Sequence, residues 1–222
     1  AAHELRSPLA AMRVELQLAL RRTRSSSEYE QVLVSSLEEV EGLISLAEDL
    51  LTLARVQGSA ATTETARAVD IVQEAARVVA GIAQMRGVEI EVPTISESLI
   101  VTGRSLDLTR ALRNILENAV AFSPDGSQVK IETARQGESI MIAVTDQGPG
   151  IAAEDMAHIF QPFFRGAEKR SHNHAGAGLG LAIARGIIEG QGGSVYVDPN
   201  YTQGSRFVIE LPRAHDGTSI QP

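Results

Sequence analysis

The chain has 222 residues, of which 43% are hydrophobic, so it is long enough and apolar enough for one large or two small domains with a real core. Its formal net charge of -8 argues against nucleic acid as the main partner, because that role needs a basic surface. Cysteine is absent, which excludes a disulfide framework and a thiolate zinc site. No apolar run reaches the roughly 20 residues that cross a bilayer, so we expect this chain to be soluble.

Residues 1 to about 57 are predicted to form two long helices. Apolar residues in the second helix recur at alternating steps of four and three, which is the pattern of a coiled-coil seam. Further leucines broaden this stripe, so the helix should bury two faces, as in a four-helix bundle. Two helices cannot complete such a bundle, and we expect a second copy of the chain to supply the other pair. The seam residues are Leu33, Leu37, Val40, Ile44, Ala47, Leu51 and Ala54, and the broadening residues are Leu43, Leu46, Leu50 and Leu53.

The ends of these helices also carry signals. The polar residues 21–27 are predicted to form a hairpin loop, and Ser27, followed by Glu28 and Glu30, is expected to start the second helix. The first helix begins almost at residue 1, although a helix needs its first turn satisfied by a cap or by preceding residues. We therefore expect the chain to be a piece of a longer protein, whose upstream part carries a membrane anchor.

From about residue 69 the pattern changes to mixed α and β. Because the helices come in separate blocks from hairpin-connected strands, we predict a two-layer α+β sandwich rather than a doubly wound sheet. Helices are predicted over 70–86, 106–122 and 179–189, and strands over 88–92, 99–102, 129–134, 140–145, 194–197 and 206–211. The predicted divisions are a helical hairpin over 1–58, a linker over 59–67, the α+β domain over 68–213 and a tail over 214–222.

His3 is the first residue whose neighbours in the sequence suggest a chemical role. On a helix, Arg6 and Ser7 share the face of His3, while Glu4 is turned about 100° away. Pro8 cannot donate a backbone hydrogen bond to the carbonyl of Glu4, so the helix should bend there and expose His3. The alternative is an ordinary exposed histidine on a helix that contains a proline.

Two asparagines and one aspartate are candidate ligand-binding residues. Asn114 and Asn118 lie one turn apart on one helix face, and side-chain amide oxygens are suitable ligands for Mg²⁺. Asp146 ends a strand and enters Gly148-Pro149-Gly150, where a carboxylate can accept a hydrogen bond from an amine and glycines let a ligand approach closely. A wet helix face and an ordinary turn are the structural alternatives.

A second glycine-rich segment, residues 176–181, opens a predicted helix, whose free amides and positive dipole end can hold phosphates. It is neither a P-loop nor a Rossmann turn, since GxxxxGK[ST] is absent and no suitable strand precedes it. Three of the five phenylalanines cluster before the polar segment 166–176, which is expected to be a mobile lid. His172 and His174 in this segment have no third ligand nearby, so a metal pair is not favoured.

In this order, the motifs resemble the signature of two-component sensor histidine kinases, and the resemblance covers residues 3 to about 211. Any one of the five boxes would be weak, but five at family-like spacing make chance a poor explanation. Residues 3–9 are similar to the phospho-acceptor box, 114–119 to the asparagine box, 146–151 to the first glycine box, 159–166 to the phenylalanine box and 176–181 to the second glycine box.

The resemblance implies a cytoplasmic homodimer that binds ATP and Mg²⁺, phosphorylates His3 and passes the phosphoryl group to an aspartate of a response regulator receiver domain. It implies that Glu4 accepts the imidazole proton, with Arg6 beside it, and that Ser7 orients water when phosphate is removed from the regulator. It also implies that Asn118 binds the metal with Asn114 close by. The implied nucleotide residues are Asn114, Asn118, Asp146, Gly148, Gly150, Ile151, Phe160, Arg165, Gly176, Gly178, Leu179, Gly180 and Leu181.

Two departures from the family pattern bear on the nucleotide. Ala121 stands where many members have a lysine that contacts phosphate, and Phe122 stands where a tyrosine is frequent. One rival interpretation is a non-kinase ATPase of the gyrase type, which uses ATP to close a dimer clamp. The other is a dimeric scaffold with a degenerate nucleotide site. Phosphate on a receiver protein would exclude the first, and failure to bind ATP would favour the second.

Overall fold

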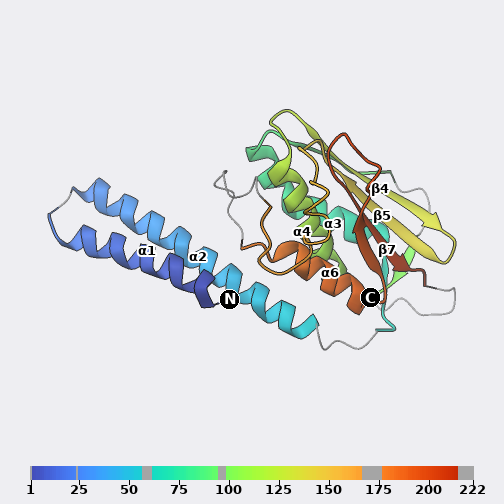
Figure 1. Cartoon of the computed structure of the whole chain (residues 1–222), viewed down its shortest axis with the longest axis horizontal. Helices are drawn as coiled ribbons and strands as arrows, with labels where there is room; N and C mark the ends of the chain where they lie inside the picture. Colours follow the sequence, from blue (N-terminus) through green and yellow to red (C-terminus); the bar gives the residue numbers. More distant parts are fainter. Residues whose placement is uncertain (1, 24, 57–61, 95–98, 167–176, 215–222) are drawn as a thin grey trace. The chain divides into compact units, whose positions relative to one another are not determined.

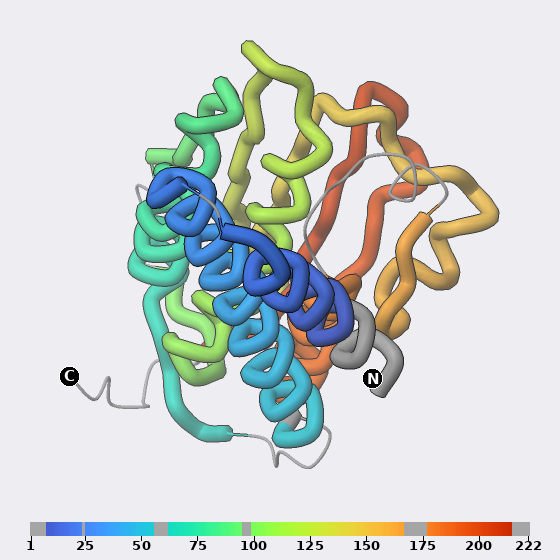
Figure 2. Tube along the Cα trace, turned by 90° about the vertical axis from the view of Figure 1, so that its left-hand side faces the viewer, coloured from blue at the N-terminus to red at the C-terminus, as the bar shows by residue number. Residues whose placement is uncertain are grey.

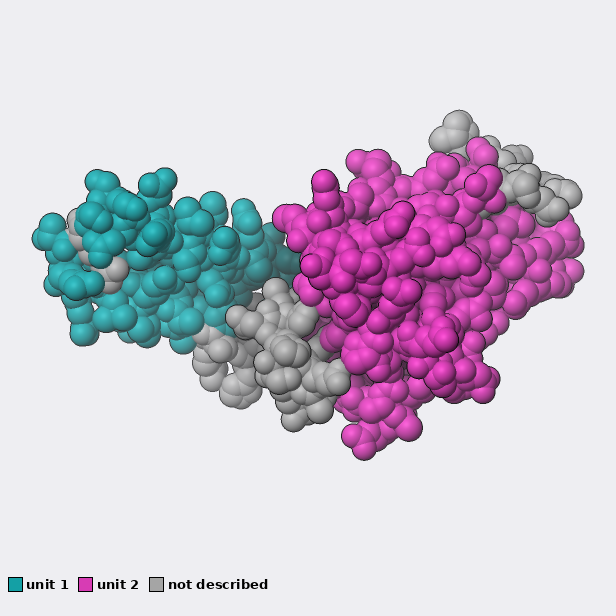
Figure 3. Space-filling view, turned by 90° about the horizontal axis from the view of Figure 1, so that it is seen from above, with its two compact units in different colours: residues 1–52 teal, residues 53–222 magenta. Residues whose placement is uncertain are grey.

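The structure is a computed structural model, and it divides into two compact units, residues Ala1–Thr52 and Leu53–Pro222 (Figure 3). It describes residues 2–23, 25–56, 62–94, 99–166 and 177–214, without the side chains of residues 2–7 and 56. Within these ranges, no helix combines the length and the apolar character that a bilayer crossing needs.

The first unit is a hairpin of two helices, as predicted. α1 (Ala2–Leu20) and α2 (Ser26–Val56) lie side by side in Figures 1 and 2. Ala19 on α1 and Val32 on α2 are buried, and Ser35 on α2 donates a hydrogen bond of 3.3 Å to Glu15 on α1. Pro8 lies inside α1, and the helix continues through it. Each helix thus buries a small aliphatic side chain, and one polar contact joins the two helices.

The start of α2 is a capping box centred on Ser25, and the prediction of Ser27 as the starting residue is wrong. The Ser25 hydroxyl accepts a hydrogen bond of 3.3 Å from the backbone N–H of Glu28, and the Glu28 carboxylate accepts one of 2.8 Å from the backbone N–H of Ser25. Two amides that the helix itself leaves unpaired are thereby satisfied. The acidic residue that marks the cap is three places after Ser25 rather than next to it.

We expect Ser25→Ala to lower the free energy of unfolding of the hairpin by about 1 kcal/mol, because the N-cap hydroxyl is lost. Urea unfolding followed by far-ultraviolet circular dichroism measures this change. Ser27→Ala is the matched control, since Ser27 is an exposed serine in the first turn of the same helix. Equal losses in the two variants would contradict Ser25 as the cap.

The second unit is a sheet covered on one face by helices, which confirms the predicted two-layer α+β sandwich (Figure 1). The strand order is β2-β4-β5-β7-β6, with β2 parallel to β4 and all other neighbours antiparallel. The helices are α3 (Ala68–Met85), α4 (Ser105–Phe122) and α6 (Gly180–Gly190). The strands are β2 (Glu89–Glu91), β4 (Gln128–Gln136), β5 (Ser139–Thr145), β6 (Ser194–Val197) and β7 (Arg206–Pro212).

The two faces of this sheet differ. Alternate residues of the central strands, such as Ile142 on β5 and Ile209 on β7, are fully buried in the core under the helices. On the other face, Met141, Ala143 and Val208 form a small separate apolar cluster. Polar side chains from the neighbouring strands share this second face with the cluster.

Residues 65–67, predicted to end the linker, are instead a strand of the second unit. β1 (Thr65–Arg67) pairs antiparallel with β3 (Ile100–Thr102) in a two-stranded sheet. Next to this pair, the carbonyl oxygen of Glu64 accepts a hydrogen bond of 2.7 Å from Gly103, and its carboxylate lies 2.9 Å from the guanidinium of Arg104. The buried Gln191 accepts the backbone N–H of Arg104 at 3.2 Å. The chain is thus fastened to the start of α4 from residue 64 onward.

Candidate functional site

One cavity in the second unit, of about 330 Å³, lies where the predicted nucleotide motifs meet. It is bounded by the end of α4, the loop after β5, the segment 151–166, the start of α6 and the start of β7. None of its lining residues, which all belong to the described part of the chain, is a lysine or an arginine. They are Asn118, Phe122, Pro149, Gly150, Ile151, Ala152, Glu154, Asp155, Ile159, Phe164, Gly166, Gly178, Leu181, Ser205 and Phe207.

The two asparagines of α4 have different surroundings. Asn118 lines the cavity, whereas Asn114 is buried outside its lining. The side-chain amide of Asn114 donates a hydrogen bond of 3.1 Å to the carbonyl oxygen of Gly180, the first residue of α6. Asn114 therefore ties α4 to the start of α6, whereas Asn118 is the one of the two asparagines that lines the cavity.

Asp146 is not itself a lining residue of the cavity, and backbone groups hold it beside Ser205, which is one. Its side chain is almost fully buried, and its Oδ1 atom accepts hydrogen bonds of 2.9 Å from the backbone N–H groups of Gly148 and Ser205. The backbone N–H of Asp146 in turn donates a hydrogen bond of 2.9 Å to the carbonyl oxygen of Ser205. The carboxylate is thus fixed in direction by the loop after β5 and by the residue directly before β7. That residue, Ser205, also lines the cavity.

Burial raises the pKa of the Asp146 carboxyl, and the hydrogen bonds from Gly148 and Ser205 partly oppose this shift. Desolvation dominates because a carboxylate loses more by leaving water than these donors return. A buried carboxylate with a raised pKa beside a cavity is a common feature of ligand sites.

The backbone around Asp146 requires glycine at position 204. Gly204 has φ of +145°, and a Cβ atom there would clash with the carbonyl oxygen of Asp146. Gly148 has a similar restriction, since its Cβ would lie 2.9 Å from the carbonyl oxygen of Phe122. The two turns can approach Asp146 only without side chains.

The start of α6 is also tightly built. Gly178 has φ of +73°, and a Cβ atom would lie 2.7 Å from the carbonyl oxygen of Phe164. Its own carbonyl accepts a hydrogen bond of 3.0 Å from Phe163, which has φ of +65° although it is not a glycine. Gly178 and Leu181 line the cavity, whereas Leu179 is buried in the core. The helix thus begins at the wall of the cavity.

The three clustered phenylalanines do not share one role. Phe164 lines the cavity, while Phe160 packs edge-on against Phe207 with ring centroids 6.4 Å apart and lies outside the lining. Arg165 is half-buried and is not a lining residue. The rest of the predicted lid, residues 167–176 with His172, His174 and Gly176, lies outside the described residues.

The phospho-acceptor residues belong to the other unit. His3, Glu4, Arg6 and Ser7 lie in the first two turns of α1. Their side chains lie outside the description of the structure, so the predicted shared face of His3, Arg6 and Ser7 stays a prediction.

Several cavity residues escaped the sequence analysis. Ser205 directly precedes β7 and Phe207 is its second residue, while Glu154 and Asp155 come from the loop after the first glycine-rich turn. Ser205 follows Gly204 directly before an apolar strand, which was the available signal for a turn that touches a ligand. Phe122 was noted only as a departure, yet it lines the cavity.

The donors in this region suit a metal that keeps water and phosphate around it. No group of three histidine, aspartate or glutamate side chains in the described ranges could hold a metal ion. A protein-only metal cage is thus not formed by these residues, and the Asn118 amide beside the cavity is the kind of oxygen donor that Mg²⁺ accepts together with substrate phosphates.

Comparison with known protein families assigns both halves of the chain. Residues 103–215 match the family described as histidine kinase-, DNA gyrase B-, and HSP90-like ATPase, and residues 1–59 match the His Kinase A (phospho-acceptor) domain. The chain therefore belongs to the histidine kinases, with an ATP-binding domain of the gyrase and HSP90 type behind a phospho-acceptor domain. This confirms the resemblance on which the five boxes were assigned.

Individual relatives agree with this assignment. The chain is 38% identical over 216 residues to the sensor-like histidine kinase SenX3 of Mycobacterium tuberculosis (strain ATCC 25618 / H37Rv), covering 95% of the chain and 52% of SenX3. It is 35% identical over 212 residues to the sensor protein IrlS of Burkholderia pseudomallei (strain K96243), covering 95% of the chain and 45% of IrlS. The chain thus spans about half the length of these relatives.

Solved structures share the fold. Full-length ShkA in complex with AMPPNP has a TM-score of 0.68 at 26% identity, over 99% of this chain and 46% of ShkA. The histidine kinase ThkA in complex with the response regulator protein TrrA has a TM-score of 0.75 at 20% identity, over 96% of this chain and 60% of that one.

Proposed function

We propose that this chain uses ATP to phosphorylate His3 and then transfers the phosphoryl group to an aspartate of a response regulator receiver domain. The observation that carries this proposal is the cavity lined by Asn118, Gly150 and Gly178, in a chain whose α1 begins with a phospho-acceptor box. ThkA, a structural neighbour, was solved with a response regulator protein, which supports a regulator as the partner.

Adenine is assigned to the Asp146 end of the cavity. A carboxylate oriented by two backbone N–H groups can accept a hydrogen bond from the adenine amino group. Gly148, Gly150 and Ile151 shape the turn beside it, and Phe160 supports the wall through Phe207. AMPPNP bound to ShkA supports a triphosphate nucleotide in this fold.

The phosphates are assigned to the start of α6. Backbone N–H groups in the first turn of a helix have no partner within the helix, and the positive end of the helix dipole favours anions. Gly178, Leu179, Gly180 and Leu181 occupy this turn, and we assign Gly176 and Arg165 to the same phosphates. With Ala121 in place of a lysine and no basic residue among the described lining residues, nucleotide affinity should depend strongly on these amides and on the metal.

Mg²⁺ would be held by Asn118, with Asn114 fixing the neighbouring start of α6. When bound, the ion would neutralise charge on the phosphate oxygens. The residues of this chain would orient the nucleotide and would offer it the backbone N–H groups at the start of α6.

At the acceptor, a ring nitrogen of His3 attacks the γ-phosphorus, the bond from that phosphorus to the β–γ bridging oxygen breaks, and ADP leaves. Glu4 takes the proton from the other ring nitrogen, which makes the attacking nitrogen more nucleophilic. Arg6 is assigned to the incoming phosphoryl charge. A carboxylate oxygen of the receiver then attacks the phosphorus and the bond from the phosphorus to the ring nitrogen breaks. The proton held by Glu4 returns to the ring at the same time, so that His3 is neutral and Glu4 is ionised again. Ser7 is assigned to orienting water in dephosphorylation of the regulator.

A second copy of the chain is proposed to complete the four-helix bundle. Leu33, Ile44 and Leu51 on the predicted seam of α2 are 65%, 54% and 58% exposed in a single chain. Burying such a row of leucines and isoleucines stabilises an oligomer by roughly 1.5–3 kcal/mol for each side chain fully covered. The proposed domains are the helical hairpin over 1–58 and an ATP-binding domain that begins with β1 at Thr65 and extends to residue 213, with a short linker between them and a tail over 214–222. We place this part in the cytoplasm, within a parent protein anchored in the membrane.

Incubation of the chain with γ-labelled ATP and Mg²⁺ tests the chemistry. We expect label that is lost in acid and survives base, and its transfer to a receiver domain but not to the variant whose acceptor aspartate is asparagine. Label that survives acid and is lost in base would contradict a phosphohistidine. Hydrolysis of ATP without labelling would support the clamp ATPase instead, and no ATP binding would support the scaffold.

A further inference from the structure

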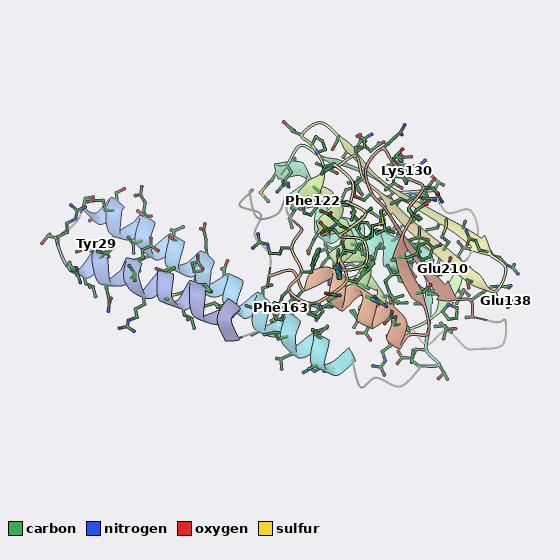
Figure 4. All side chains as sticks on the ribbon, in the orientation of Figure 1. Tyr29, Phe122, Lys130, Glu138, Phe163 and Glu210 are labelled. Carbon is green, nitrogen blue, oxygen red and sulfur yellow. The ribbon has the colours of Figure 1, made fainter. Side chains whose placement is uncertain are left out.

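Arg206 stands at the first position of β7, next to the cavity residue Ser205. Because side chains alternate along a strand, Arg206 lies on the face of the sheet opposite to Phe207, away from the helices. Figure 4 labels Lys130 on β4 and Glu210 on β7, the two strands that lie on either side of β5. Arg206 thus sits behind the nucleotide site.

The guanidinium of Arg206 joins three parts of the second unit. Its Nη2 atom lies 3.2 Å from Glu132 on β4, across the intervening strand β5, and its Nη1 atom lies 3.4 Å from Asp198, the residue after β6. The side chains of Arg206 and Asp198 are 27% and 24% exposed, so this pair is less accessible than the other ion pairs of the second unit that the structure describes. A partly buried arginine with two carboxylates is held more firmly than an isolated surface pair.

Asp198 lies at the start of the loop that leads to Ser205 and contacts the residue that follows this loop, Arg206. Its N–H donates a hydrogen bond of 2.8 Å to the carbonyl oxygen of Arg206, and its Oδ1 atom accepts one of 3.0 Å from the N–H of Asn200. Its Oδ2 atom is the one that meets Arg206. The loop over residues 198–205 therefore leaves the sheet and returns to it at the same ionic contact.

We infer that Arg206 is a positioning residue for adenine recognition, acting through Ser205 and Asp146. The N–H and the carbonyl oxygen of Ser205 both pair with Asp146, so the direction of the carboxylate depends on where β7 begins. Arg206 fixes that starting point from behind, against β4 and the end of β6. This inference rests on the proposed ATP site and adds the residue that aligns it.

Arg206→Met tests the inference, because methionine keeps most of the stem and removes the guanidinium. We expect the KM for ATP to rise about three- to tenfold, with the rate of His3 phosphorylation at saturating ATP unchanged. The preference for ATP over GTP should fall as well, since the carboxylate that selects the amino group is less well aligned. The KM for ATP of Arg206→Lys should lie between those of the parent and Arg206→Met, because one ammonium group cannot bridge both carboxylates in the same way.

Arg77→Met is the matched control, as it removes an arginine whose ion pair with Glu74 is exposed on α3. It should leave both KM and the ATP preference unchanged. If Arg206→Met lowers the melting temperature without changing the KM or the ATP preference, its role is structural and the inference is overturned. If Asp146→Asn also leaves ATP affinity unchanged, the adenine assignment itself fails, which separates the two proposals.

Discussion

His3→Gln should reduce phosphorylation of this chain by γ-labelled ATP to background while leaving ATP affinity unchanged. Glutamine retains a polar side chain of similar size but has no nitrogen that can accept a phosphoryl group. The residues to which we assign the nucleotide all lie in the second unit, which this change does not touch. Labelling followed by autoradiography, together with calorimetric titration of ATP, measures both quantities on the same preparation.

His158 and His215 provide matched controls for this experiment. Replacing either of them by glutamine should leave labelling unchanged, since neither lies in the phospho-acceptor box. Residual labelling of His3→Gln would assign the phosphoryl group to another residue. A mixture of His3→Gln with a variant unable to bind ATP would then tell whether the group moves within one subunit or between two.

Asp146→Asn is expected to weaken ATP binding by about 1.5–3 kcal/mol, or roughly 10- to 150-fold, because a hydrogen bond to a charged group is lost. An asparagine can still accept the N–H groups of Gly148 and Ser205 through its oxygen. The asparagine nitrogen would then face the adenine amino group, so that two hydrogen-bond donors would meet and no acceptor would be present. Calorimetric titration of ATP into the two proteins measures the difference.

The pH dependence follows from the raised pKa of Asp146. The acceptor form is the carboxylate, so ATP affinity should fall as the pH is lowered through a value above that of an ordinary aspartate. A folded-state pKa above the unfolded one also means that this group favours folding at low pH and that this contribution is lost as the pH rises through the folded value. Asp146→Asn should therefore not be less stable than the parent at pH 7.

A thermal melt at pH 7 is the control for that variant. Loss of ATP affinity with an unchanged melting temperature would support Asp146 as the adenine contact. If the affinity for ATP stays within a factor of two of the parent, the assignment of adenine to this carboxylate is wrong.

The secondary structure followed closely from periodicity where elements are long. The helices over 105–122 and 180–190 begin and end within one residue of the positions expected, because their buried residues recur at helical spacing. β1 was missed because three residues, Thr-Ala-Arg, show no alternation that separates a strand from a linker. The capping box was present in the sequence, but three consecutive serines hid which one precedes Glu28 by three places.

The site was predictable where its residues are close in sequence. Asn118, Gly150 and Gly178 belong to compact motifs, and the structure brings them to one cavity. The contact between Ser205 and Asp146 spans 59 residues and depends on the pairing of β5 with β7, which spacing alone does not give. The different surroundings of Asn114 and Asn118 likewise depend on where α6 begins, because Asn114 is bonded to its first residue.

The fastening of Glu64 to Gly103 and Arg104 has a mechanical consequence. A force applied to the chain just before residue 64 would act first on these contacts of Glu64. From there a rigid rod, α4, leads within four turns to the asparagine at the cavity. The contacts of Glu64 and the cavity residue Asn118 are therefore connected through one helix, so that a shift of the helix start would be passed on to the cavity lining.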